Sequence, residues 1–340
     1  MQMGKHLIGR YLPGLAVAMS VFLPLAAGPV LAKPSTPRTI LATRFAKIAP
    51  LSPAGAFGHV TVVESPVFGP DGQLYFVNLS AAPDQAKVRK LDVKTKKLTD
   101  IYFDDHSEFS SLQFSPVDGR MYLTDYGAGK IVSMTKDGKD FRTEFEGKID
   151  GHVRTLDDIA FDQDGSMFVS DEFGTTWAPE GVVIKFDKQG HNPKVLMRGL
   201  AGANGISFTP DYSGLWVSEY RRGQITHFWL NEDHTAITDG VIGIRANTGK
   251  AGFDSNAVDT AGNIYQAVWD GARFLVFNQT GDHLATIKIP QNLPRPQTLT
   301  TNIAIKPGTR QGYLIVGGEN GGYLYRFRAF AEGGRQSNGG

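Results

Sequence analysis

The sequence contains no cysteine among its 340 residues. Disulfide bonds, thiolate metal sites and a cysteine nucleophile are therefore all excluded, and packing must stabilise the fold. The chain also lacks a tract rich in lysine and arginine, and its formal net charge at pH 7 is only +1. A near-neutral chain without a basic tract does not have the electrostatic footprint of a nucleic-acid-binding protein, so we expect no nucleic-acid partner.

Uncharged runs of membrane-spanning length are absent beyond the N-terminal region. Lys5 and Arg10 precede an uncharged run from Tyr11 to Ala32, which ends in the small-residue cleavage pattern Val30-Leu31-Ala32. We therefore predict a signal peptide over residues 1–32, a mature chain of residues 33–340 with no membrane segment, and a secreted or periplasmic location. The alternative is an uncleaved membrane anchor, but prolines and glycines interrupt the run.

A sustained helical period is also missing, whereas glycine is frequent at 40 residues, which favours β-structure with many turns. One phrase recurs six times at intervals of 46 to 50 residues. Each copy has an apolar residue in its fifth place, a turn rich in Pro, Asp and Gly, and a second alternating apolar run. The copies begin at Glu64, Ser110, Asp157, Asn204, Asp254 and Thr301.

The spacing of the copies matches one four-stranded propeller blade. The sequence therefore predicts an all-β fold, a single six-bladed β-propeller with four-stranded blades around a central tunnel, over residues 33–340. We expect "RTILATRFAKI" (residues 38–48) to supply a strand that pairs with "GGYLYRFRAF" (residues 321–330) and closes the ring. The alternative, a pair of β-sandwiches, does not require one phrase to recur six times.

The first residue of each copy precedes an innermost strand, so the six first residues should converge on the tunnel. All six side chains carry oxygen, and three are carboxylates, which repel one another in a confined space unless they are protonated or neutralised by a cation. This pattern predicts one divalent metal ion, with Ca²⁺ ahead of Mg²⁺ or Mn²⁺ and Zn²⁺ less suited. The alternative is a hydrogen-bonded polar plug, in which Ser110 and Thr301 fit better than as ligands.

Three of the phrases, "ESPVFGPDGQLYFVN", "ANGISFTPD" and "FDSNAVDTAGNIY", resemble motifs of the SMP-30/gluconolactonase/LRE family. The resemblance implies a six-bladed propeller that hydrolyses lactones and, in some relatives, organophosphates. It also implies one divalent cation at the tunnel mouth, with ligands at Glu64, Asn204 and Asp254. A second asparagine of the family pattern is replaced here by Asp157, and Asp158 matches the aspartate that follows it.

The implied reaction is metal-dependent hydrolysis of a small-molecule lactone or related ester. A divalent cation polarises the carbonyl and a carboxylate accepts a proton from water. The resemblance assigns the base role, or a nucleophilic role in phosphotriester-cleaving relatives, to Asp254. Asp157 is a second candidate, as a metal ligand or an outer-shell base, because crowded carboxylates have raised pKa values.

Candidate substrate contacts are Asp158, Arg154, His152 and Trp269, although a loop histidine is as readily a solvated side chain and a tryptophan can simply pack. Glu172 and Tyr220 also follow strands and receive no role. We expect a monomer. Two rival functions remain, a non-catalytic ligand-binding propeller with a structural metal and a phosphotriesterase-like hydrolase.

Overall fold

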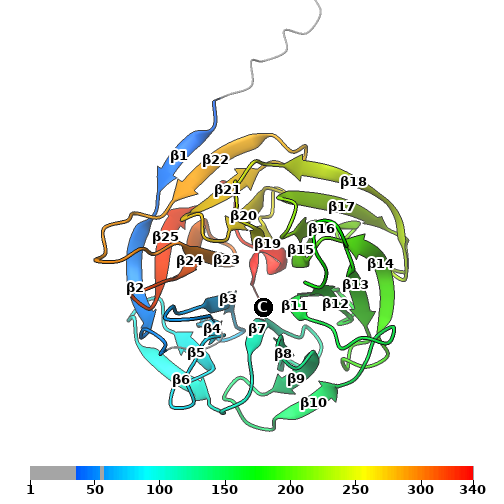
Figure 1. The fold of residues 1–340 in the computed structure, drawn as a ribbon, viewed down its shortest axis with the longest axis horizontal. Coiled ribbons are helices and arrows are strands. Elements are labelled where there is room, and N and C mark those ends of the chain that lie inside the picture. Colours follow the sequence, from blue (N-terminus) through cyan, green and yellow to red (C-terminus); the bar gives the residue numbers. More distant parts are fainter. Residues whose placement is uncertain (1–35, 54–56, 340) are drawn as a thin grey trace, which may run out of the picture. The chain divides into compact units, whose positions relative to one another are not determined.

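A computed structural model describes residues 36–53 and 57–339, so the predicted signal peptide lies outside the described residues. The described chain is almost entirely β-structure, arranged as six sheets in a ring (Figure 1). Five sheets have four strands and one has five. The predicted six-bladed β-propeller is therefore confirmed. In the part of the chain that the structure describes, no helix has the length and apolar character needed to cross a membrane.

Apart from the outermost strands of the last two blades, the strands of each blade follow one another in sequence, with the first innermost, as Figure 1 shows. The first three blades comprise β3 (Val63–Phe68), β4 (Leu74–Asn78), β5 (Val88–Leu91) and β6 (Leu98–Tyr102); β7 (Phe109–Phe114), β8 (Met121–Asp125), β9 (Lys130–Met134) and β10 (Arg142–Phe145); and β11 (Leu156–Phe161), β12 (Met167–Asp171), β13 (Gly181–Phe186) and β14 (Lys194–Leu200).

The last three blades follow the same order, and the fifth and sixth each carry one N-terminal strand at the outer edge. They comprise β15 (Ala203–Phe208), β16 (Gly214–Glu219), β17 (Gln224–Leu230) and β18 (Ile237–Arg245); β19 (Phe253–Val258), β20 (Ile264–Val268), β21 (Arg273–Phe277), β22 (His283–Lys288) and β1 (Arg38–Leu41); and β23 (Leu299–Ile305), β24 (Gln311–Gly317), β25 (Gly322–Arg328) and β2 (Thr43–Ala49). A short 3₁₀ turn, η1 (Arg335–Ser337), follows the last blade.

The ring closes through the N-terminal strands. β2 pairs antiparallel with β25, so the predicted pairing of residues 38–48 with the C-terminal strand is confirmed for β2. β1 instead pairs in parallel with β22 and becomes the fifth strand of the fifth blade. One N-terminal segment thus covers the outer edges of two neighbouring blades, and fewer backbone groups are left unpaired.

The apolar residue in the fifth place of each copy ends its innermost strand and is buried between blades. These residues are Phe68, Phe114, Phe161, Phe208, Val258 and Ile305, each at most 5% exposed. Aromatic rings join neighbouring blades: the rings of Tyr75 and Phe114 meet edge to face at 5.0 Å. The repeated phrase therefore specifies the contact that holds adjacent blades together.

All six innermost strands have an irregularity in strand pairing near their first residues. The breaks lie between Glu64 and Val67, Phe109 and Ser111, Leu156 and Ile159, Ala203 and Ile206, Phe253 and Asn256, and Thr300 and Asn302. A bulge of this kind re-aims side chains and is frequent beside functional sites. Here it falls on or beside the first residue of every repeat, where the strand alternation alone does not determine the direction of the side chain.

Candidate functional site

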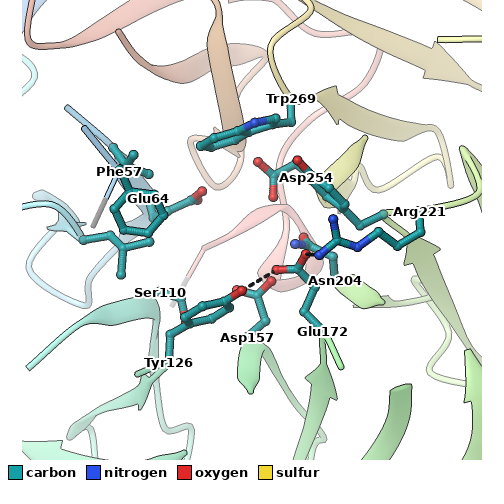
Figure 2. A pocket seen from close by; sticks show the side chains of 13 residues that line it. Phe57, Glu64, Ser110, Tyr126, Asp157, Glu172, Asn204, Arg221, Asp254 and Trp269 are labelled. Atoms are coloured by element: carbon teal, nitrogen blue, oxygen red, sulfur yellow. Dashed lines mark hydrogen bonds and ion pairs between the residues drawn. The ribbon is translucent and has the colours of Figure 1, made fainter. Parts of the chain in front are cut away.

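Five of the six repeat-initial residues line one pocket of about 210 Å³ at the centre of the ring. We call these five the inner ring: Glu64, Ser110, Asp157, Asn204 and Asp254. Figure 2 shows their side chains around a common space. The sixth, Thr301, does not line the pocket; its hydroxyl donates a hydrogen bond of 2.7 Å to the carbonyl oxygen of Val63. Thr301 therefore joins the last blade to the first.

A second set of pocket residues follows the second strand of each blade by one position. We call this set the strand-exit ring: Leu79, Tyr126, Glu172, Tyr220 and Trp269. The corresponding residue of the sixth blade is Gly318. Phe57, Val62 and Arg221 complete the lining. The pocket is therefore lined chiefly by two positions in each of the first five blades, the second residue of the innermost strand and the residue that follows the second strand.

One wall of the pocket is apolar. Trp269 and Tyr126 pack against a small buried cluster of Val62, Leu79 and Leu299. The Trp269 amide donates a hydrogen bond of 3.0 Å to the carbonyl of Gly252, which fixes the backbone of the loop that carries the indole. Trp269, predicted as a substrate contact, thus borders the space over the inner ring (Figure 2).

The inner-ring carboxylates are buried and close enough to affect one another. Burial raises the pKa of Glu64 well above its usual range, and the charges of Asp254, Asp157 and Asp158 raise it further. The pKa of Asp157 is raised first by burial and then by Asp158, Glu172 and Asp254. Burial also raises the pKa of Asp254, to which the charge of Glu172 adds. Without a counter-ion, these carboxyl groups favour the protonated form.

The donor atoms fit a hard divalent cation in kind. Asn204 Oδ1 and Asp254 Oδ2 are buried and have no hydrogen-bond partner among the described residues. Such unpartnered buried oxygens are unusual in folded proteins. In residues 36–53 and 57–339, no three His, Asp or Glu side chains form a ready-made metal-binding group. The lining supplies the ligand types that Ca²⁺ prefers, and a cation would neutralise the crowded carboxylates.

Asp158 lies outside the pocket lining although it adjoins Asp157. Its side chain is 5% exposed, and its amide donates a hydrogen bond of 3.0 Å to Ser170 Oγ. Burial raises the pKa of its carboxyl to about 7, against the opposing hydrogen bonds from Ser255 and Ser111. Asp158 thus belongs to the buried polar interior next to the inner ring and does not line this pocket, and its contact with substrate stays a prediction.

Arg154 and His152 also do not line the pocket. The Arg154 guanidinium is buried, 3.1 Å from the carboxylate of Asp171, and donates to the carbonyl of Ile149 at 3.2 Å. His152 is exposed, and its ring centroid lies 6.1 Å from that of Phe173. Asp171, at a strand end, accepts a hydrogen bond of 2.8 Å from the Thr155 amide, so it braces the entering loop.

Glu172 and its partners are pocket residues to which the sequence assigned no role. The Tyr126 hydroxyl donates a hydrogen bond of 2.9 Å to Glu172, and an Arg221 nitrogen lies 3.5 Å from the same carboxylate (Figure 2). Burial raises the pKa of Glu172, while these two partners oppose that rise. The recurring position after the second strand of each repeat is the sequence signal that could have identified Tyr126, Glu172 and Tyr220.

Comparison with known proteins identifies the family. The chain matches the model of the SMP-30/gluconolactonase/LRE-like region over residues 63–303, and it belongs to that family. The resemblance inferred from the motifs is therefore confirmed.

Individual relatives align with most of this chain. The lactonase drp35 of Staphylococcus epidermidis is 26% identical in an alignment of 289 positions, which covers 78% of this chain and 83% of the relative. Regucalcin of Agrobacterium tumefaciens, solved as a calcium-binding protein, aligns with a TM-score of 0.67 at 15% identity over 88% of this chain and 99% of that one. A gluconolactonase of Xanthomonas campestris aligns with a TM-score of 0.64 at 17% identity over 87% and 99%. The two structural likenesses show a shared fold.

Proposed function

We propose that the protein is a secreted or periplasmic lactone hydrolase that depends on one divalent cation, with Ca²⁺ as the preferred ion. The observation that carries the proposal is the inner ring, in which three carboxylates and one amide from four blades line a single pocket. The lactonase and gluconolactonase relatives support the reaction class. The calcium-binding regucalcin structure supports the choice of ion, and the N-terminal pattern of residues 1–32 supports export.

The cation would be held by Glu64, Asp157, Asn204 and Asp254. When bound, it would supply a Lewis acid that polarises the ester carbonyl and stabilises the negative charge developing on its oxygen. The unpartnered Asn204 Oδ1 and Asp254 Oδ2 are the donor atoms that lack another role among the described residues.

Asp254 is the proposed general base. The Asp254 carboxylate has two oxygens, so one can hold the cation while the other accepts a proton from an attacking water. Asp157, crowded by Asp158 and Glu172, is the second carboxylate able to hold that proton. Trp269 and Tyr126 orient the lactone ring against the apolar wall and exclude water from that side of the pocket.

A hydrolysis panel tests the proposal. Purified mature protein is assayed on lactones and phosphotriesters as isolated, after chelation, and with Asp254→Asn. We expect cation-dependent lactone turnover that Asp254→Asn lowers by about 10²- to 10⁴-fold. Faster turnover of phosphotriesters than of lactones would contradict the reaction class. Bound cation with no turnover on either class would instead identify a binding propeller.

A further inference from the structure

We propose that Arg221 sets the charge preference of the pocket for its substrates. This inference rests on the proposed lactone hydrolysis and adds a specificity-determining residue to it. Arg221 follows the strand-exit residue Tyr220 and is the only basic residue among the described residues that line the pocket. Four lining residues, Glu64, Asp157, Glu172 and Asp254, are acidic. Arg221 is therefore the one positively charged side chain beside four acidic ones among the described lining residues. Replacing it should change the electrostatic potential of the pocket strongly.

The backbone of Arg221 is held from two sides. Its amide donates a hydrogen bond of 3.1 Å to the carbonyl of Ala201. Its carbonyl accepts one of 3.0 Å from Thr176 Oγ1, in the loop that follows β12 of the third blade. The root of the side chain is therefore fixed between two blades, and the guanidinium reaches the pocket from a defined position (Figure 2).

The guanidinium itself is only partly engaged. It lies 3.5 Å from Glu172 and 4.9 Å from the centroid of the Tyr220 ring, and the side chain is 44% exposed. A guanidinium has five N–H donors, and the ion pair with Glu172 is the one polar side-chain contact found for Arg221 within the described residues. Donors thus remain for a ligand at the pocket rim, where water screens the charge without abolishing its effect.

The position of Arg221 gives a prediction about ligand charge. A positive side chain at the rim favours ligands that carry a negative or oxygen-rich group near it and disfavours ligands that carry an ammonium. When the guanidinium is removed, Glu172 loses its cation and the remaining rim charge is negative. The substrate preference should then move toward positively charged lactones, while kcat/KM for uncharged lactones should change little.

Three γ-lactones of equal ring size provide the measurement: γ-butyrolactone, its α-trimethylammonio derivative, and 5-oxotetrahydrofuran-2-carboxylate. In Arg221→Gln, we expect kcat/KM for the cationic lactone to rise about threefold and that for the anionic lactone to fall about threefold. These are the changes expected for one screened charge at about 6 Å. The ratio of the two therefore shifts about tenfold, and Arg221→Lys should largely retain the wild-type ratio.

Arg222→Gln is the matched control. Arg222 adjoins Arg221, lies 3.5 Å from Glu219 and donates to the carbonyl of Thr176, but it does not line the pocket. We call kcat/KM for the cationic lactone divided by that for the anionic lactone the charge ratio. We expect the charge ratio of Arg222→Gln to equal that of wild type. The shift in Arg221→Gln should also shrink in about 0.5 M salt, because screening weakens a charge effect but not a packing defect.

The outcomes separate this inference from the proposed function. If wild type hydrolyses the neutral lactone and Arg221→Gln leaves the charge ratio unchanged, or changes all three lactones equally, the role of Arg221 is refuted and the lactonase proposal stands. An equal shift in Arg222→Gln also refutes it. If wild type hydrolyses none of the lactones, both proposals fail.

Discussion

The Tyr126 hydroxyl donates a 2.9 Å hydrogen bond to Glu172, and this contact joins the strand-exit residues of the second and third blades. Glu172 in turn raises the pKa of Asp157 and Asp254 by its charge, so the strand-exit ring and the inner ring are electrostatically one unit. The position of the Glu172 carboxylate therefore affects both candidate bases.

Tyr126→Phe removes that hydrogen bond. We expect a loss of about 1–2 kcal/mol in the free energy of unfolding, because a bond to a buried charged acceptor is stronger than a neutral one. Urea unfolding provides the measurement. Tyr122→Phe is the control, since the Tyr122 hydroxyl donates a longer bond of 3.3 Å to Asp118 in a turn. Equal losses in the two variants would contradict the special role of the Tyr126 contact.

Asp157→Asn removes one of the crowded carboxylates. With a chelator present, we expect the variant to unfold about 2–4 °C above wild type at pH 8, because burial and like charges disfavour the ionised form. With millimolar Ca²⁺ the order should reverse, because wild type gains more from the cation. Thermal unfolding in the two buffers tests this crossing, and the same order in both buffers would exclude Asp157 as a ligand.

Arg154→Met leaves the buried Asp171 carboxylate without its cation. We expect the free energy of unfolding of this variant to be about 3–5 kcal/mol lower than that of wild type at pH 7.5. Burial raises the pKa of Asp171 to about 6. The native state therefore binds the proton of the Asp171 carboxyl more tightly than the unfolded chain does. The contribution of that bound proton to stability is lost as pH rises through 6.

Because Arg154 opposes that pKa rise, the deficit of Arg154→Met should be small near pH 4 and grow as pH increases through 6. Urea unfolding at several pH values gives the deficit. Arg198→Met is the control, since Arg198 is 59% exposed where it pairs with Asp150, and such pairs stabilise little. A deficit that does not depend on pH would contradict the claim that Arg154 stabilises the fold by pairing with the ionised Asp171 carboxylate.

Trp269→Ala enlarges the pocket and removes part of its apolar wall. We expect KM for a lactone to rise about tenfold with a smaller change in kcat, because the indole contributes binding in both ground and transition states. Steady-state kinetics measure both constants. Trp177→Ala is the control, since Trp177 is 94% exposed and should leave both constants unchanged. A loss confined to kcat would contradict a simple binding role.

The sequence predicted the architecture because every repeat carries the same physical requirement. An apolar residue such as Phe114 must fill the space between blades, and a polar residue such as Asp254 stands near the start of each innermost strand, inside the strand and not before it as the sequence predicted. Six copies of that pattern predict both the number of blades and the convergence of the inner ring. Thr301 is the exception, because its hydroxyl bonds the Val63 carbonyl of the first blade.

The remaining site features depend on geometry that single residues do not reveal. The irregularity in strand pairing at Asp157 and Asp158 directs two adjacent carboxylates toward different surroundings. The amino-acid composition of the segment does not indicate this irregularity. Arg154 lies close to the predicted site in sequence. Its guanidinium nevertheless pairs with the buried carboxylate of Asp171 in the adjoining strand and so lies within the blade. The position of Arg221 depends on a hydrogen bond from Thr176 of the neighbouring blade to its backbone carbonyl, which the sequence does not reveal.

The central claim is that the inner ring holds a divalent cation for lactone hydrolysis. Its most direct test is a titration of chelated wild-type protein with Ca²⁺ while the initial rate of lactone hydrolysis is followed. We predict no turnover without the ion and a saturable recovery as Ca²⁺ is added, with Asp254→Asn recovering less than about one hundredth of the wild-type rate. Full turnover in the chelated protein, unaffected by added Ca²⁺, would contradict the claim.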